Sequence, residues 1–189
     1  EAKKFQAHAI LGLEKGENLF LGEDGWSGDY VPAMMARGPF MIGFQNREVE
    51  GKTIKEPVIH IDMDNPRVGV EAGQSLFLAY GGDTPYLANV AQTLQVIHQG
   101  AGFSDSFFSM LDAMELLEPV NIDLSLSSIT NINLRDYFTI NSDKLANLDG
   151  ESLEKLNKMG MLSHIYFALV SLGNFNKLMT LKNKKMAIA

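Results

Sequence analysis

The alternation of apolar and polar residues gives the first part of the chain the pattern of strands. Short apolar runs at residues 5–13, 18–21, 40–44 and 57–63 are separated by segments that contain Gly or Pro, as in strands joined by turns. The polar stretch 45–56 then predicts an exposed loop between the last two strands. We therefore expect β-hairpins at the start of the fold.

A helical pattern begins at Thr84, which can cap a helix N-terminus, and Pro85 suits the first helical position. Apolar residues recur every three or four positions up to Gly100, where we expect the helix to end. A second helix is expected from near Ser104 to just before Pro119. These signals predict two separate helices.

The strand pattern then returns once. Residues alternate between apolar and polar at 120–126 and 132–140, which predicts a hairpin with its turn at 127–130. We expect this hairpin to extend the earlier sheet.

The chain ends in helical segments. Asp149 is an expected N-cap, and a long amphipathic helix is expected after Gly160, with a bend near Gly173. The elements together predict an α+β fold in a single domain spanning the whole chain. Residues 1–83 would form its β-rich half, and residues 84–189 its helical half with the hairpin.

One motif occurs twice. GLEKGENLFL, beginning at Gly12, returns as GVEAGQSLFL, beginning at Gly69, and the identities keep one offset as far as Gly25 and Gly82. A phosphate-binding loop and a structural turn can both have this composition. A phosphate loop connects a strand to a helix N-terminus, whereas here Leu-Phe-Leu follows the glycines. We favour two related turn-and-strand units, each packing its Phe against the core.

Charge and composition narrow the function classes. The net charge is -7, and this argues against nucleic acid as a partner because duplex binding depends on basic residues that neutralise phosphates. The chain has no cysteine, which excludes disulfides, thiolate metal sites and a cysteine nucleophile.

No membrane span is expected, because the longest strongly apolar run, at 165–172, is far shorter than the roughly 20 residues that a membrane helix needs. The chain begins EAKK without a Met, and we suspect that upstream sequence is missing. A targeting signal is then not observable, so cytoplasmic and envelope locations both stay open.

Two patterns are candidates for a site. His60 and Asp62 share one face of an expected strand, and with His164 they could form the two-histidine, one-carboxylate site of an iron enzyme. The same residues lead into Pro66, which is ordinary turn chemistry. The second candidate is a Gly-punctuated segment that concentrates side chains favoured at interfaces: Trp26, Tyr30, Pro32, Met34, Met35, Arg37 and Phe40. Trp26, on a polar loop, is the member we expect to be most exposed.

The chain resembles the SapC-like family. The resemblance rests on GENLF at Gly16, on Trp26, on YVPA at Tyr30, and on Arg37 followed by Pro39-Phe40. Leu-Leu-Glu-Pro before the hairpin and Ser-Leu-Gly-Asn near the end are also similar to that family in order and spacing. The resemblance implies a bacterial protein of a surface-layer or export-related envelope system, and it carries over no catalytic residue.

Two functions follow from these observations. The first is a non-catalytic accessory or binding protein without a cofactor, which engages a protein or small molecule through the Trp26 to Phe40 segment. A homo-oligomer is compatible with this function. The alternative is an Fe(II)-dependent oxygenase-like enzyme that uses His60, Asp62 and His164.

Overall fold

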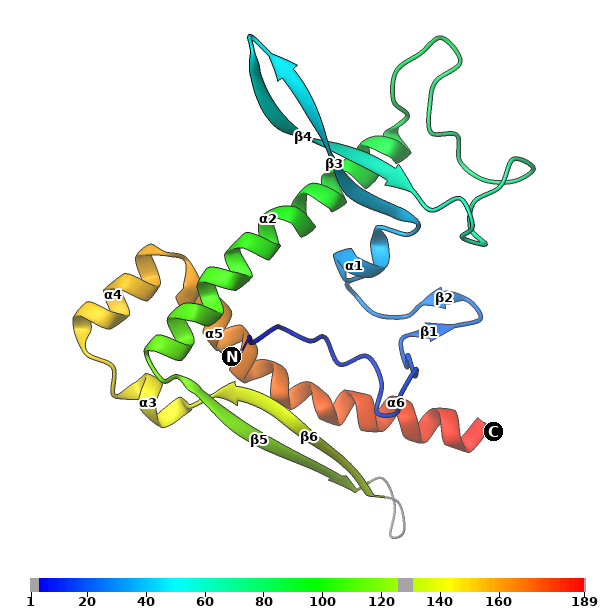
Figure 1. The fold of residues 1–189 in the computed structure, drawn as a ribbon. Coiled ribbons are helices and arrows are strands. Elements are labelled where there is room, and N and C mark those ends of the chain that lie inside the picture. Colours follow the sequence, from blue (N-terminus) through cyan, green and yellow to red (C-terminus); the bar gives the residue numbers. More distant parts are fainter. Residues whose placement is uncertain (1–3, 126–130, 189) are drawn as a thin grey trace. The chain divides into compact units, whose positions relative to one another are not determined.

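The computed structural model describes residues 4–125 and 131–188, and it divides the chain into two compact units (Figure 1). Unit 1 comprises residues 1–27 and 104–189, and unit 2 comprises residues 28–103. The described residues form three separate two-stranded antiparallel sheets together with helices. The predicted α+β class is confirmed.

Unit 2 is built around one long hairpin of β3 (Phe40–Val49) and β4 (Lys52–Ile61). The two strands are joined by Glu50 and Gly51, whose φ angles of 53° and 77° suit a tight hairpin turn. The prediction of a loop at 45–56 is therefore wrong, because its polar residues lie in paired strands. Sequence alternation marks only the half of a hairpin that is buried on one face.

The buried face of this hairpin packs against the first part of helix α2 (Pro85–Ala113). Phe40 lies opposite Ile61 and Ile42 lies opposite Ile59, so these four side chains share one face. Phe40 forms a core with Val90 and Leu94, and the ring pairs Phe40–Tyr86 and Phe44–His98 continue the contact in both directions. The α2 residues in these contacts are spaced four apart, so they lie on one face of the helix, along the hairpin: Tyr86, Val90, Leu94 and His98.

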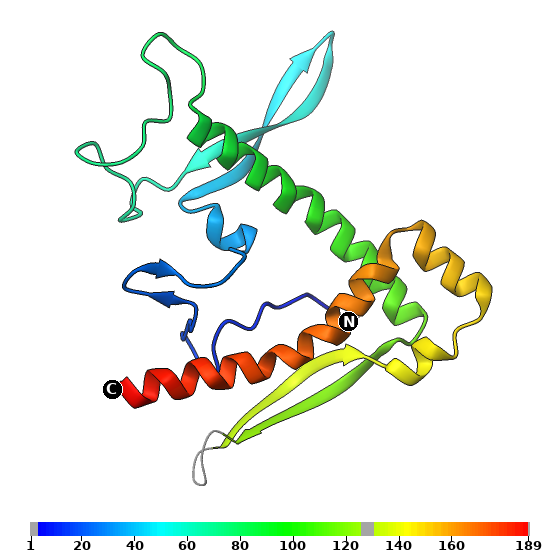
Figure 2. The same cartoon turned by 180° about the vertical axis from the view of Figure 1, so that it is seen from behind.

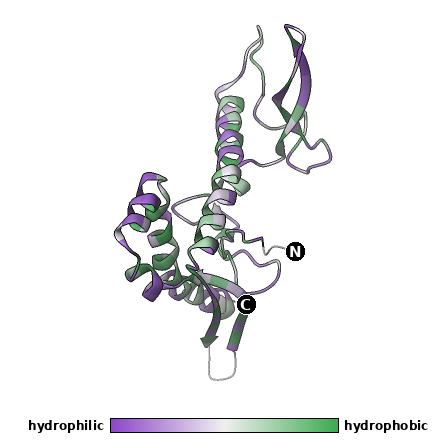
Figure 3. Ribbon diagram, turned by 60° about the vertical axis from the view of Figure 1, so that its left-hand side comes forward, coloured by the Kyte–Doolittle hydropathy of each residue, from purple (hydrophilic) through white to green (hydrophobic). Residues whose placement is uncertain are grey.

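Helix α2 continues through Gly100, where a helix end was predicted, so that prediction is wrong. A glycine lowers the stability of a helix interior by only about 1 kcal/mol relative to alanine, and the packing of apolar residues before and after Gly100 in the helix outweighs this cost. Thr84 does cap the helix, since its Oγ1 accepts a hydrogen bond from the Leu87 N–H at 3.3 Å. In Figure 3 hydrophilic and hydrophobic segments alternate along α2, as expected for a helix with one apolar face.

Unit 1 places the hairpin of β5 (Leu117–Ser125) and β6 (Asn131–Ile140) beside helices α5 (Met161–Ser171) and α6 (Phe175–Ile188), as Figures 1 and 2 show from opposite sides. Leu13, Leu124 and Leu178 form its core with residues from the N-terminal segment. The predicted hairpin is confirmed, although it is a separate sheet and does not extend the earlier one. Its predicted turn at 127–130 lies outside the described residues.

Short helices complete unit 1. Helix α3 (Ser142–Ala146) was not predicted, and Asn141 caps it. Helix α4 (Gly150–Lys158) begins at the predicted cap, where Asp149 Oδ1 accepts the Ser152 N–H at 2.8 Å. Near Gly173, where a bend was predicted, the short 3-10 helix η1 (Leu172–Asn174) connects α5 to α6.

The N-terminal segment differs from its prediction. Residues 5–13 contain no strand, and the only strands in this region are β1 (Leu21–Gly22) and β2 (Gly25–Trp26). The segment is anchored by a backbone hydrogen bond from Leu19 to Leu11 and by Ile10 and Leu13, which pack on the core of unit 1. Its apolar residues therefore serve packing and not a ladder.

The core of unit 2 provides a test of this fold. We expect Leu94→Ala to lower the free energy of unfolding by about 2–5 kcal/mol, because the side chain is buried between α2 and the β3–β4 hairpin. Val96→Ala, at an exposed position of the same helix, should change it by no more than about 0.5 kcal/mol. Chemical denaturation measures both, and equal effects would contradict the described packing.

Candidate functional site

The first copy of the repeated motif forms a closed turn. The Glu17 N–H donates to the Glu14 carbonyl at 3.1 Å, and the Leu19 N–H donates to the Leu11 carbonyl at 2.8 Å. The Glu17 carboxylate folds back and accepts the Leu13 N–H at 3.0 Å. Gly16 has a φ of 79°, which a residue with a side chain rarely adopts. The glycine pattern therefore shapes a backbone turn.

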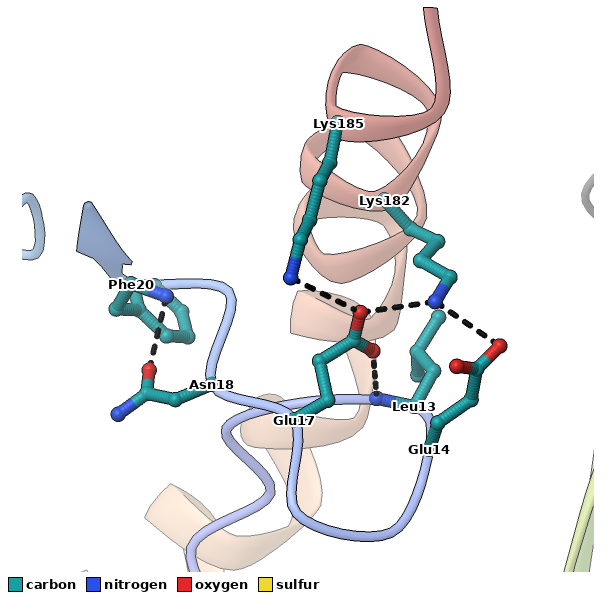
Figure 4. Close-up of polar contacts among 7 residues, drawn as sticks. All are labelled: Leu13, Glu14, Glu17, Asn18, Phe20, Lys182 and Lys185. Carbon is teal, nitrogen blue, oxygen red and sulfur yellow. Dashed lines mark hydrogen bonds and ion pairs between the residues drawn. The ribbon is translucent and has the colours of Figure 1, made fainter. Parts of the chain in front are cut away.

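Helix α6 binds this turn through a buried lysine side chain (Figure 4). Lys182 is only 7% exposed, and its Nζ lies 2.8 Å from Glu17 Oε1 and 3.0 Å from Glu14 Oε1. Lys185 adds a longer contact of 3.6 Å to Glu17. Lys182 and Lys185 thus have a specific structural role, which is to hold the turn of copy 1 against α6.

The network shifts the pKa values of both partners. Burial opposes ionisation of Glu17, but hydrogen bonds from Lys182 and from the Leu13 N–H outweigh it and hold the pKa of Glu17 below its ordinary value. The hydrogen bond to Glu17 raises the pKa of Lys182 against the opposing effect of burial, with Glu14 adding to the rise. Both groups are therefore held in their charged forms.

The second copy shares part of this geometry. Gly25 and Gly82 both have positive φ, at 99° and 91°, and both turn the chain after Leu-Phe-Leu. The hydroxyl that follows donates back to this segment in each case, from Ser27 to the Phe20 carbonyl and from Thr84 to the Leu76 carbonyl. These parallels support a structural turn used twice.

The aromatic residues of the two copies differ. Phe20 packs on the core of unit 1, as expected, whereas Phe77 is 64% exposed, so that part of the prediction is wrong. The first leucine of the Leu-Phe-Leu sequence, Leu19 or Leu76, packs on the core of its own unit in both copies.

Trp26, the residue expected to be most exposed, is half-buried. Its ring stacks on Phe20 with centroids 5.6 Å apart, and Lys177 Nζ lies 5.9 Å from the centre of the same Phe20 ring. Trp26 belongs to unit 1, while Tyr30 and the rest of the predicted binding segment belong to unit 2. Its present contacts are those of a packing residue.

The exposed part of the segment surrounds helix α1 (Ala33–Ala36), which has no buried residue. Pro32 precedes the helix, and its carbonyl accepts the N–H groups of Met35 and Ala36. Tyr30 is 71% exposed and Met34 is 60% exposed, with Val31 and Met35 also exposed. Val31 was not among the predicted binding residues.

Arg37 and Phe40, at the end of the predicted binding segment, are hydrogen-bonded to each other. Arg37 Nη1 donates to the Phe40 carbonyl at 2.7 Å, and the Phe40 N–H donates to the Arg37 carbonyl at 3.1 Å. Phe40 itself is buried in the core of unit 2. Arg37 Nε is buried without a hydrogen-bond partner among the described residues. The contacts of both residues stabilise unit 2.

The candidate iron ligands are divided between the two units. His60 and Asp62 lie in unit 2 and His164 lies in unit 1. Asp62 Oδ1 accepts the Asp64 N–H, and the His164 ring lies 2.9 Å from the Gly160 carbonyl. Within residues 4–125 and 131–188 no three His, Asp or Glu side chains form a group that could hold a metal ion.

Two further observations concern ligands and membranes. A hollow of about 350 Å³ in unit 1 is lined by residues 8–15 with Glu17, Leu134 and Tyr137. Two of its carboxylates, Glu14 and Glu17, already bind Lys182, and we assign it no ligand. No helix of the described chain is both long and apolar enough to cross a membrane.

The fold thus defines an α+β protein of two units, each holding one copy of a glycine turn. The model of the SapC family matches residues 1–178, and the chain belongs to this family. No curated protein matches the chain, and no solved structure does.

The two copies differ in their need for glycine. A Cβ on Gly12 would collide with the backbone of Glu17, whereas a Cβ on Gly69 would meet no atom within 4 Å. We expect Gly12→Ala to destabilise the protein by roughly 1–3 kcal/mol and Gly69→Ala to be neutral or slightly stabilising. Thermal and chemical denaturation distinguish the two, and equal costs would contradict the open turn in copy 2.

The ion network predicts a pH dependence. The lowered pKa of Glu17 stabilises the fold above the ordinary glutamate value of about 4.3, and this contribution is lost as pH falls further. The raised pKa of Lys182 gives a contribution that is present below about pH 10.4 and is lost at higher pH.

Lys182→Met should therefore cost roughly 1–3 kcal/mol at neutral pH, because it removes the hydrogen bond from Lys182 to the buried carboxylate of Glu17. The cost should shrink as pH falls below the ordinary glutamate pKa of about 4.3, because Glu17 is then progressively protonated, first in the unfolded chain and at lower pH in the folded one. Lys185→Met is the control and should change stability by about 0.5 kcal/mol at most, since its side chain is exposed. Urea unfolding across pH measures this, and a cost that is independent of pH would contradict the charged network.

Proposed function

We propose that this SapC-family chain is a non-catalytic accessory or binding protein of a bacterial envelope or surface-layer system. The resemblance that places its family beside export genes supports the setting. The location, cytoplasmic or envelope-associated, and the possible homo-oligomer stay predictions.

The proposed contact is with a protein, through residues 30–35. The observation that carries this proposal is the exposure of Tyr30, Val31, Met34 and Met35 around a helix that buries none of its residues. Methionine side chains adapt to irregular surfaces, and tyrosine buries a large area at a small cost in conformational entropy. Side chains of this kind, on a single helical turn and in the residues just before it, suit contact with another protein.

The structure also selects residues for the test. Trp26 and Arg37 were natural targets from the sequence, but their contacts with Phe20 and with the Phe40 carbonyl make their substitution a test of stability. Tyr30 and Met34 are better targets because most of their surface is accessible.

The experiment compares tagged wild-type protein with Tyr30→Ser combined with Met34→Ser in lysate of the native bacterium. We expect the variant to recover at least about tenfold less of any protein that the wild type retains, with an unchanged melting temperature. Val96→Ser, at an exposed apolar position of α2 in the same unit, should retain the partner.

Recovery that is equal for the two proteins, or no recovered partner at all, would reject this contact. If the double variant lowers the melting temperature, Met34→Ser alone repeats the comparison, because Met34 contributes little to the core.

A further inference from the structure

Copy 2 of the glycine turn, residues 69–82, exposes the surface that copy 1, residues 12–25, buries. Leu13 is in the core of unit 1, between β5 and α6, whereas its counterpart Val70 is fully exposed. Phe77 is 64% exposed, whereas its counterpart Phe20 packs on the core of unit 1. The same motif is therefore covered by a helix in one unit and uncovered in the other.

The backbone of copy 2 is also open. Copy 1 closes through hydrogen bonds donated by the N–H groups of Glu17 and Leu19. The corresponding groups of Gln74 and Leu76 make no such bonds in the described structure. Gly73 has a φ of 141°, compared with 79° at Gly16, so the turns differ at the glycine itself.

The polar side chains of copy 1 that bind helix α6 have counterparts in copy 2. Glu71 corresponds to Glu14, and Gln74 offers an amide oxygen where Glu17 offers a carboxylate. Glu71 forms no ion pair with any residue that the structure describes. Copy 2 thus exposes the apolar side chain of Val70, the carboxylate of Glu71 and the amide oxygen of Gln74. In copy 1 the residues at these three positions bind Leu178 and Lys182.

We propose that copy 2 is a docking site for a helix of a partner protein that presents an apolar residue and, one turn later, a lysine. Copy 1 on α6 shows the arrangement: Leu178 packs with Leu13, and Lys182 binds the two acidic side chains. Docking would close the turn of copy 2 and bury Val70. This site is separate from residues 30–35 and does not rest on the function proposed above.

The occupant is a different protein and not a second copy of this chain. Leu178 and Lys182, the α6 residues that bind copy 1, are already buried in unit 1. A second copy could offer them only by opening its own unit 1. A lysine-bearing helix also suits a chain whose net charge is -7.

The experiment titrates the full-length protein with a fluorescent peptide of residues 172–188, which serves as a helix of known complementarity. We expect a Kd on the order of 10–100 µM, since a short helix loses ordering entropy on binding. Val70→Asp and Glu71→Lys should each weaken binding at least tenfold. The peptide carrying Lys182→Glu should lose affinity for the wild type and recover most of it with the Glu71→Lys protein.

Hydrogen exchange gives a second readout. Binding should slow exchange at the amides of Gln74 and Leu76, which are the counterparts of the closing bonds in copy 1. Gly69→Ala should leave the free protein stable but weaken binding, because the closed turn has no room for a Cβ at the corresponding Gly12.

Absence of binding up to about 1 mM peptide would overturn the proposal, since that limit is only about 4 kcal/mol of affinity. Binding that is unaffected by Val70→Asp and Glu71→Lys would also overturn it, because the peptide would then occupy another surface. Sedimentation of the protein alone adds one more outcome: a dimer that Glu71→Lys dissociates would reject the partner protein in favour of a second copy.

Discussion

A lysine that is almost fully buried holds the N-terminal and C-terminal ends of unit 1 together. Lys182 brings one positive charge to a turn that carries Glu14 and Glu17, and the two carboxylates provide the hydrogen bonds that justify its burial. The core leucines Leu13 and Leu178 lie directly beside this network. The turn, the helix and the hydrophobic core therefore depend on one another, and a charge lost from the network affects all three.

The repeated motif shows how one sequence pattern can serve two structural contexts. Its glycines bend the backbone in both units, and its first leucine packs on the local core in both. The copies differ in the helix that covers the start of the motif. Among the described residues, α6 packs on Leu13 of copy 1, and no helix packs on Val70 of copy 2. Glu14 and Glu17 of copy 1 are explained by α6, and the single acidic residue of copy 2, Glu71, contributes to the docking site inferred above.

The elements predicted correctly are those whose structure depends on residues close together in the sequence. The caps at Thr84 and Asp149 and the hairpin that contains Pro119 were predicted correctly because each depends on neighbouring residues. The helix end at Gly100 was wrong because tertiary packing outweighs a glycine. The length of the β3–β4 hairpin was missed because its outer half is solvated on both faces and shows no alternation.

The candidate site was harder to predict, because exposure is a property of the folded chain. Trp26 and Phe40 have the composition of an interface, and only the structure shows that one stacks on Phe20 and the other belongs to the core. The pairing of Glu17 with Lys182 joins positions that are 165 residues apart, so no local pattern could reveal it. A signal was present in the coincidence of an acidic turn and a basic C-terminal helix.

The division into units has a consequence for how the protein is made. Unit 2 is one continuous segment, whereas unit 1 combines residues 1–27 with residues 104–189. During synthesis from the N-terminus, unit 2 has all its residues while most of unit 1 has yet to be translated. The first copy of the motif cannot form its contact with Lys182 until that residue has left the ribosome, so Leu13 and its neighbours stay uncovered by α6 on the nascent chain during that interval.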